Sequence, residues 1–165
     1  MKKFLPILVV IVVVGIIGSI IYLATKSSGS STATTDSANN SPTTTEQPKS
    51  LVSGDITIAG ATATIYYGNG CPHCANLEKW LVDNNFLPNV NPVDQTAIDS
   101  WAANAKIKFA IKEVWYNQTN SAELSDKAAI CKIPEKQVGV PFMFDSATSK
   151  CYTGETDIEN YFLGK

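Results

Sequence analysis

Charged residues and cysteines are both scarce in this chain. Asp, Glu, Lys and Arg make up 17% of its 165 residues, with a net charge of −2 and a pI near 5.3. That balance argues against a nucleic-acid-binding protein, which normally carries a basic patch. Four cysteines are too few for a small domain held together by disulfides alone. No internal repeat is visible, which argues against a repeat architecture.

An apolar run dominates the N-terminus. Residues 4–24 carry no charge, and as a helix they would be roughly 30 Å long, the thickness of a bilayer core. Lys2 and Lys3 precede the run and only Lys26 follows closely, so the positive-inside rule places the N-terminus in the cytoplasm. The run exceeds the h-region of a signal peptide, which favours an uncleaved signal-anchor at residues 1–25, although Ala24 leaves a cleavage site open. Either interpretation exports the rest of the chain to an oxidising compartment.

Residues 26–50 predict a flexible linker. Thirteen of these 25 residues are Ser or Thr, and the segment lacks apolar periodicity. Such a composition cannot bury enough surface to offset the entropy of ordering. A coil of this length spans roughly 25–30 Å on average, which would keep the domain close to the membrane. The remaining residues, 51–165, are enough for one hydrophobic core.

This remaining part alternates between strand-like and helix-like segments. The patterns predict strands at 61–67, 106–116, 138–144 and 151–153, and helices at 72–85, 91–105, 120–133 and around 158–162. Asn91-Pro92 predicts one helix start, and Asn120 with Glu123 predicts another. A short strand at 56–58 is compatible with the pattern but is not counted in the sheet. The order predicts an α/β fold with a four-stranded mixed sheet flanked by helices.

The most informative stretch is Cys71-Pro72-His73-Cys74, which follows a predicted strand and a Gly-Asn-Gly loop. Two thiols with two residues between them can close a disulfide ring or hold a metal ion. A cysteine at a helix N-terminus faces unpaired N–H groups and the positive end of the helix dipole, which stabilises a thiolate. Helical spacing with later leucines places Cys74 on the buried face and Cys71 at an exposed tip. The motif therefore favours redox chemistry.

Cys131 and Cys151 are the other two cysteines, and they fall on a predicted helix and a predicted strand. In an exported protein we expect them to form a structural disulfide. The alternative is a pair of buried free thiols, because cysteine often packs like a small hydrophobic residue.

Two motifs together resemble the thioredoxin superfamily: Tyr-Tyr-Gly-Asn-Gly-Cys-Pro-His-Cys and the later Gly139-Val140-Pro141. The resemblance covers residues 61–165 and implies a thioredoxin-like fold. The Pro-His dipeptide resembles the DsbA-type thiol oxidases, whereas the domain size resembles a thioredoxin or glutaredoxin. The resemblance implies that Cys71 is the nucleophile and Cys74 the resolving thiol. It also implies that Pro141 is a cis-proline facing this pair and that Val140 presents its backbone to a substrate.

The residue six positions before the first cysteine departs from the resemblance. Many members of the family carry a buried acid there, whereas this chain has Ile65. Proton transfer to and from Cys74 must then use water or another group, for which Glu113 is a candidate. His73, the single histidine, can favour a thiolate through charge or a hydrogen bond. We therefore count His73 and Pro72 with the catalytic residues.

These features predict a membrane-tethered, extracytoplasmic thiol–disulfide oxidoreductase whose only redox group is the Cys71–Cys74 pair. His73 and the exported location favour an oxidase or isomerase acting on protein thiols and disulfides, recycled by an unidentified membrane redox partner. Three alternatives stay open: a thioredoxin-like reductase, a copper- or zinc-binding module, and an interaction module with a structural disulfide. Metal binding has less support, because Cys131 and Cys151 lack the neighbouring ligand that zinc sites usually have. We expect no metal and no nucleic acid.

Overall fold

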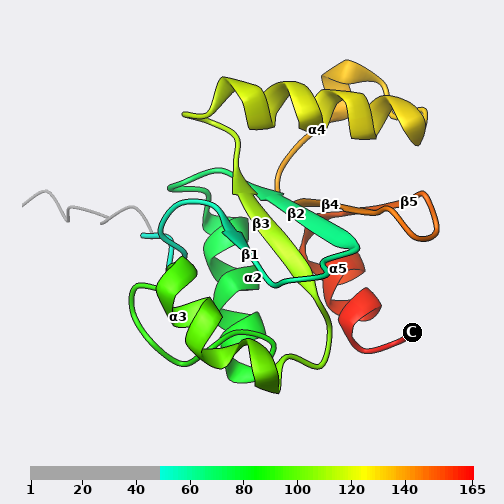
Figure 1. Ribbon diagram of the computed structural model, residues 1–165. Helices are drawn as coiled ribbons and strands as arrows, with labels where there is room; N and C mark the ends of the chain where they lie inside the picture. The colour runs from blue at the N-terminus through cyan, green and yellow to red at the C-terminus, as the bar shows by residue number, and fades with distance from the viewer. Residues whose placement is uncertain (1–48) are drawn as a thin grey trace, which may run out of the picture. The chain divides into compact units, whose positions relative to one another are not determined.

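The computed structural model describes residues 49–165 (Figure 1). The predicted anchor at 1–25 and all but the last two residues of the predicted linker lie outside the described residues. No helix in this described part is long and apolar enough to cross a membrane.

Five strands form one mixed sheet in the order β1-β3-β2-β4-β5. The strands are β1 (Ile56–Thr57), β2 (Ala63–Tyr67), β3 (Phe109–Glu113), β4 (Phe142–Asp145) and β5 (Lys150–Thr153). β2 and β3 run parallel, and the other neighbouring pairs are antiparallel. The α-helices are α2 (Pro72–Asp83), α3 (Gln95–Trp101), α4 (Gln118–Ile130) and α5 (Gly154–Phe162), with 3₁₀ turns η2 (Ala102–Asn104) and η3 (Glu135–Gln137).

The α/β prediction is confirmed, but the prediction of four strands is wrong. The fifth strand is β1, which pairs with the open edge of β3 through Ile56 opposite Ile111. Ile58 N extends this contact by donating to Phe109 O at 3.0 Å. Both isoleucines are buried, so the short segment is held by the sheet edge and the core. The short strand that the sequence pattern allowed at 56–58 is therefore present, but two residues have too little periodicity to show that they join the sheet.

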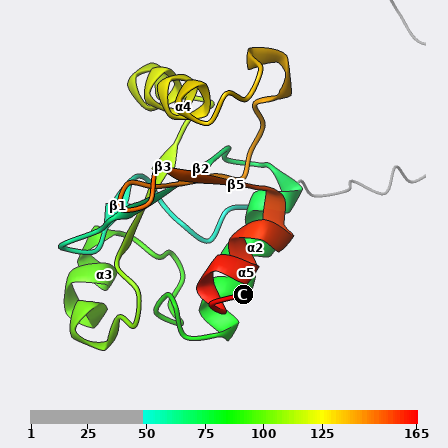
Figure 2. The same cartoon turned by 90° about the vertical axis from the view of Figure 1, so that its right-hand side faces the viewer.

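The helices cover the two faces of the sheet unequally (Figure 2). Among the helices of residues 49–165, only α4 lies on one face, whereas α2 and α5 pack on the other, with α3 on that same side near β1. Each face of the sheet has its own hydrophobic core, and successive side chains of β2 point to opposite faces. Ile65 and Tyr67 belong to the larger core, and Tyr66 belongs to the smaller one. The smaller core, under α4, consists of Tyr66, Val114, Leu124, Ala128, Phe142 and Phe144. This α/β/α layering leaves the end of β2 free to carry a loop and a site.

The start of α3 differs from the prediction. Asn91–Pro92 is a cis peptide bond outside the helix rather than its first turn. Val93 then pairs with the backbone near Val52, which keeps this segment extended. The helix starts only after Asp94, whose side chain accepts a hydrogen bond from Ala97 N at 2.8 Å.

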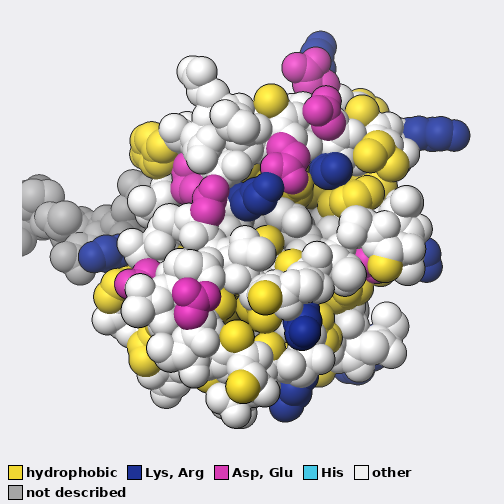
Figure 3. All heavy atoms as spheres, viewed as in Figure 1, with side chains coloured by type: hydrophobic (Ala, Val, Ile, Leu, Met, Phe, Trp, Pro, Cys, Tyr) yellow, Lys and Arg dark blue, Asp and Glu magenta, His cyan; other side chains and the backbone are white. Residues whose placement is uncertain are grey.

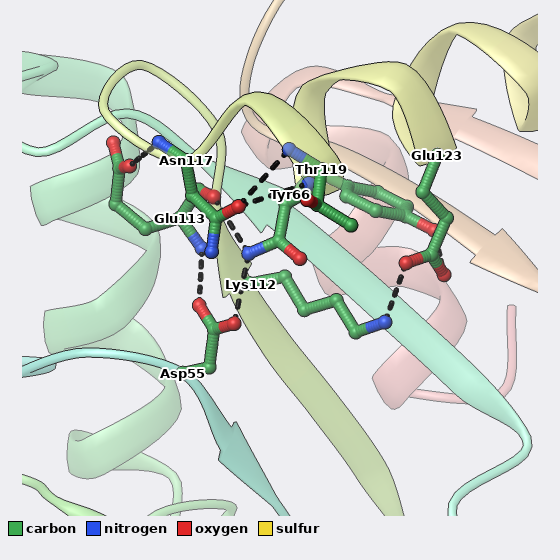
Figure 4. A network of polar contacts seen from close by, with 8 residues as sticks. Asp55, Tyr66, Lys112, Glu113, Asn117, Thr119 and Glu123 are labelled. Atoms are coloured by element: carbon green, nitrogen blue, oxygen red, sulfur yellow. Dashed lines mark hydrogen bonds and ion pairs between the residues drawn. The ribbon is translucent and has the colours of Figure 1, made fainter. Parts of the chain in front are cut away.

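The start of α4 also differs from the prediction. The N-cap is Asn117, whose side chain accepts hydrogen bonds from the backbone N–H groups of Thr119 and Asn120 (Figure 4). Asn120 lies inside the helix, where its side-chain amide donates to Asp55 and to the backbone carbonyl of Glu113. Asn120 therefore fastens α4 to the end of β3 instead of capping the helix.

Surface charge is mixed on the face seen in Figure 3. Acidic and basic side chains lie beside one another there. Lys112 and Glu123 form one ion pair, with Nζ and Oε2 2.5 Å apart. Because such partly exposed pairs contribute about 0–1 kcal/mol, we do not expect them to determine the fold.

Candidate functional site

The paired cysteines lie where β2 passes into α2. A tight loop follows Tyr67, and Cys71 N donates to Gly68 O at 3.0 Å, which turns the chain into the helix. Cys71 is the N-cap of α2 with an extended backbone, and Pro72 occupies the first turn. The first N–H groups of the helix and the positive end of its dipole therefore lie at this cysteine.

Both cysteines are free thiols, and both are buried. The prediction of an exposed tip is wrong for Cys71, which is only 6% exposed. The reason is tertiary: Val140 O lies 3.8 Å from its sulfur, and the segment around Val140 covers the helix end. Cys71 is one of the residues that line a cavity of about 450 Å³.

Cys74 is buried more deeply than Cys71, with 2% of its surface exposed. Burial raises the pKa of the Cys74 thiol, and a hydrogen bond with Cys71 raises it further. A buried thiolate is costly because no water solvates its charge. Cys74 is therefore held in its protonated form, and it must lose a proton before it can act as a nucleophile.

His73 is exposed and turns toward α5. Its Nδ1 contacts the Glu155 carboxylate, which belongs to the first turn of that helix. Within the described residues, the His73 ring is therefore held to α5 through Glu155 rather than to Cys71. Its predicted effect on the thiolate stays a prediction and would act through space.

Val140, which the resemblance implies presents its backbone to a substrate, has its carbonyl oxygen 3.8 Å from the Cys71 sulfur, and Pro141 follows it. Their peptide bond is cis, and β4 begins directly after it at Phe142. The cavity beside Cys71 is formed by this segment, by the loop after β3 and by α4. Its lining residues are Cys71, Val114, Trp115, Ser121, Leu124, Ser125, Glu135, Val138, Gly139 and Val140.

Trp115 is part of the site, although nothing in the sequence marked it. It is 52% exposed and lines the cavity beside Cys71. Its indole lies against Gly68, so closely that a Cβ at Gly68 would be 2.2 Å from Trp115 Cε2. The contact joins two loops that are far apart in the sequence, which is why only the fold reveals it.

We expect Gly68→Ala to displace the Trp115 indole and to destabilise the domain by about 1–3 kcal/mol, because the added methyl has no room. Chemical denaturation and tryptophan fluorescence would measure both effects. Gly139→Ala is the matched control, since a Cβ there meets nothing within 4 Å and the change should stay within about 1 kcal/mol. Equal stability of the two variants would contradict the packing of Trp115 on Gly68.

Glu113, the candidate for proton transfer, has a carboxylate that already accepts four backbone N–H groups. The donors are Asn69 at 3.3 Å, Trp115 and Tyr116 at 2.8 Å, and Asn117 at 3.2 Å. These bonds tie the loop before the first cysteine to the loop after β3. Glu113 therefore holds two walls of the site together, which is a positioning role.

Glu78 is the functional candidate that the sequence analysis missed. This carboxylate is 2% exposed and lies on α2, four residues after Cys74. A signal was present, because position 78 falls on the same helical face as Cys74 and Leu81. A charged residue on an otherwise apolar face is the pattern to examine, since buried carboxylates are rare unless they are paired.

The expected disulfide between Cys131 and Cys151 is present, with 6.2 Å between the two Cα atoms. Cys131 is the residue at the C-terminal end of α4, and Cys151 lies in β5. The bond therefore fastens α4, the single helix on its face, to the edge of the sheet.

Comparison with known proteins finds no match: no protein-family model, no curated protein and no solved structure matches this chain. Within residues 49–165, no group of three or more His, Cys, Asp or Glu side chains is arranged to hold a metal ion. A functional interpretation therefore starts from the cysteine pair and its surroundings.

Proposed function

We propose that this domain is a thiol–disulfide oxidoreductase of the thioredoxin-like class, which exchanges disulfides with polypeptide substrates. The observation that carries the proposal is the inequality of the two thiols. Cys71 lies at the N-terminus of α2 and lines a cavity, whereas Cys74 is sealed one turn later and kept protonated. A substrate can therefore reach only Cys71, and only Cys74 is placed to displace it.

The connectivity supports this assignment. β2, α2 and β3 form a parallel unit, and α4, β4, β5 and α5 follow with antiparallel strands. The order β3-β2-β4-β5 is the one expected for a thioredoxin-like sheet, to which β1 adds an edge. Ligands of such sheets bind at the carboxyl ends of the parallel strands, which is where the cysteine pair lies.

The cavity beside Cys71 suits an extended polypeptide. Its lining includes Val138, Gly139 and Val140, as well as Trp115 and residues of α4. Backbone groups can bind a peptide by strand-like hydrogen bonds independent of its sequence, while an aromatic side chain covers apolar ones. Such a site would bring a substrate cysteine to the Cys71 sulfur.

The chemistry follows from this arrangement. In the oxidising direction, a substrate thiolate attacks the Cys71 sulfur of a Cys71–Cys74 disulfide, and Cys74 leaves and takes up a proton. A second substrate thiolate then attacks the mixed disulfide, forming the substrate disulfide and releasing Cys71 as a thiolate. In the reducing direction, Cys71 attacks a substrate disulfide and Cys74 resolves the mixed disulfide. Each cycle transfers two electrons and needs no other cofactor.

Oxidation or isomerisation outside the cytoplasm is the direction we propose. A thiolate stabilised at the helix N-terminus stabilises the reduced form and makes the disulfide a better oxidant. Attachment through residues 1–25 and a membrane redox partner remain part of the proposal. The metal-binding alternative gains no support, because the described residues offer no third ligand beside the cysteine pair.

Equilibration of the full chain with glutathione buffers tests this proposal. We expect the Cys71–Cys74 pair to titrate reversibly with a potential above about −200 mV, in the range of isomerases and oxidases. Alkylation followed by mass spectrometry would measure it, and the Cys131–Cys151 disulfide, which should stay oxidised, is the internal control. A potential near −270 mV would indicate a reductase, and one below about −300 mV a structural disulfide.

A further inference from the structure

The mechanism above gives no role to Glu78, a buried carboxylate on α2. In a helix, residues four apart share a face, and the later side chain leans back over the preceding turn. Glu78 therefore shares the buried face of α2 with Cys74, one turn later. Both residues are 2% exposed, so neither exchanges protons freely with bulk water.

Three residues at the start of the described chain surround the Glu78 carboxylate. Oε2 accepts hydrogen bonds from Leu51 N at 2.6 Å and from Val52 N at 3.2 Å. The Ser50 hydroxyl lies 2.7 Å from each carboxylate oxygen and 3.0 Å from the backbone oxygen of Val52. No buried side-chain oxygen or nitrogen in this described region lacks a partner.

The Ser50 hydroxyl allows Glu78 to hold either charge state. When Glu78 is ionised, Ser50 donates its single proton to the carboxylate. When Glu78 is protonated, the acid donates to Ser50 Oγ, and Ser50 turns its own proton to Val52 O. A site built only to hold a carboxylate would not need this second acceptor.

The pKa shifts of Glu78 and Cys74 are consistent with one proton shared between them. Burial raises the pKa of Glu78, although the hydrogen bonds from Ser50 and the backbone oppose that rise. The charge of Glu78 contributes in turn to the raised pKa of Cys74, after burial and the bond to Cys71. Two adjacent negative charges in a buried site are unfavourable, so one proton is best held between them. The other titratable groups that face this pair are Cys71, Tyr67 on β2 and, beyond Tyr67, Glu113 and Asp55.

A route to solvent begins at Ser50. A cavity of about 390 Å³ is lined by Ser50, Tyr67 and Asn69, among other residues. Tyr116, which is 79% exposed, lies at its rim, so the cavity opens to the surface. It is distinct from the cavity beside Cys71, and protons and substrate would therefore use separate openings.

We propose that Glu78 is the group that exchanges a proton with Cys74, replacing the family acid absent at Ile65, and that Ser50 passes this proton to the second cavity. The inference rests on the proposed function. In the reducing direction, Cys74–SH gives its proton to the Glu78 carboxylate. The Cys74 thiolate then attacks the Cys71 sulfur, the Cys71–substrate bond breaks, and the substrate leaves as a thiolate that takes up a proton. In the oxidising direction, Cys74 leaves as a thiolate and recovers its proton from Glu78.

Single-turnover measurements on the full chain separate the attack by Cys71 from the resolution by Cys74. Reduced chain mixed with oxidised glutathione first forms a glutathione adduct at Cys71, which Cys74 then resolves; acid quench and mass spectrometry follow both species. We expect Glu78→Gln to slow the second step about 100-fold at pH 7 and to leave the first unchanged. The adduct should accumulate, its resolution should become faster as the pH rises, and Glu78→Asp should restore part of the rate. Glu123→Gln, which removes a carboxylate from α4, should change neither step.

The role of Glu78 and the proposed function can fail independently in this experiment. A folded Glu78→Gln chain that resolves the adduct at the normal rate overturns the role of Glu78 and leaves the exchange reaction intact. If the unsubstituted chain forms no adduct, the proposed function itself fails. Should Glu78→Gln not fold, Ser50→Ala decides the question: a slower second step supports the relay, and an unchanged one overturns it.

Equilibrium unfolding gives a second measurement. Because the folded-state pKa of Glu78 is raised above its ordinary value of 4.5, the folded state binds more protons than the unfolded state between the two values. Its contribution to stability is therefore complete below about pH 4.5 and is lost as the pH rises through the raised pKa. We expect Glu78→Gln to remove this pH dependence; identical pH dependence in both chains would overturn the inference.

Discussion

Replacing Cys71 with serine should reduce disulfide exchange by the full chain to the uncatalysed rate, a loss on the order of a thousandfold or more. A hydroxyl at this position is not ionised near pH 7 and cannot form or break a disulfide. Cys74 cannot substitute, because it is 2% exposed and cannot meet a substrate, and because burial raises its pKa and keeps it protonated until a neighbouring group takes its proton. Exchange with a fluorescent peptide disulfide would measure the loss.

Cys74→Ser is the matched control for that result. Because Cys71 still lines the cavity, this variant should attack a substrate disulfide at a near-normal rate and then stop at the mixed disulfide. Mass spectrometry should show one substrate joined to each chain, removable by dithiothreitol. If Cys74→Ser formed no adduct while Cys71→Ser did, the two roles would be reversed. If both single variants turned over normally, the cysteine pair would not be the site.

Removing the Cys131–Cys151 disulfide should cost about 3 kcal/mol of stability, from the loop entropy of a cross-link with a sequence separation of 20. For a domain of this size, the melting temperature should fall by roughly 10–15 °C. The loss should concentrate in α4, which packs alone on its face of the sheet and is fastened to β5 by this bond. Thermal unfolding of the Cys131→Ser/Cys151→Ser chain, with hydrogen exchange of α4, would test both parts.

Treating the unsubstituted chain with a reductant of low potential is the corresponding control, because it breaks the same bond without changing any residue. The potential of the Cys71–Cys74 pair should not change in the double variant, since neither serine touches the cavity beside Cys71. A stability loss below about 1 kcal/mol would show that α4 is held by its core contacts alone.

Much of the site could be predicted because its chemistry is local in the chain. The spacing of Cys71 and Cys74, the proline in the first turn and the preceding strand are set by adjacent residues. Glu113 shows the limit of that approach. The sequence made it a candidate for proton transfer, but its four backbone donors come from two loops that only the fold brings together.

The sequence by itself determined the alternation of strands and helices, the cysteine pair at a helix start and the α/β class, because these depend on periodicity and on neighbouring residues. Only the tertiary structure decided the fifth strand, the burial of Cys71, the packing of Trp115 on Gly68 and the enclosure of Glu78 by Ser50. Each of these features depends on contacts between segments that are distant in the chain. The sequence pattern does not show which distant segments pack together, so it cannot predict which side chains become buried. The spacing of the two cysteines is local to the chain, whereas the surrounding fold determines that Cys71 and not Cys74 lines a cavity.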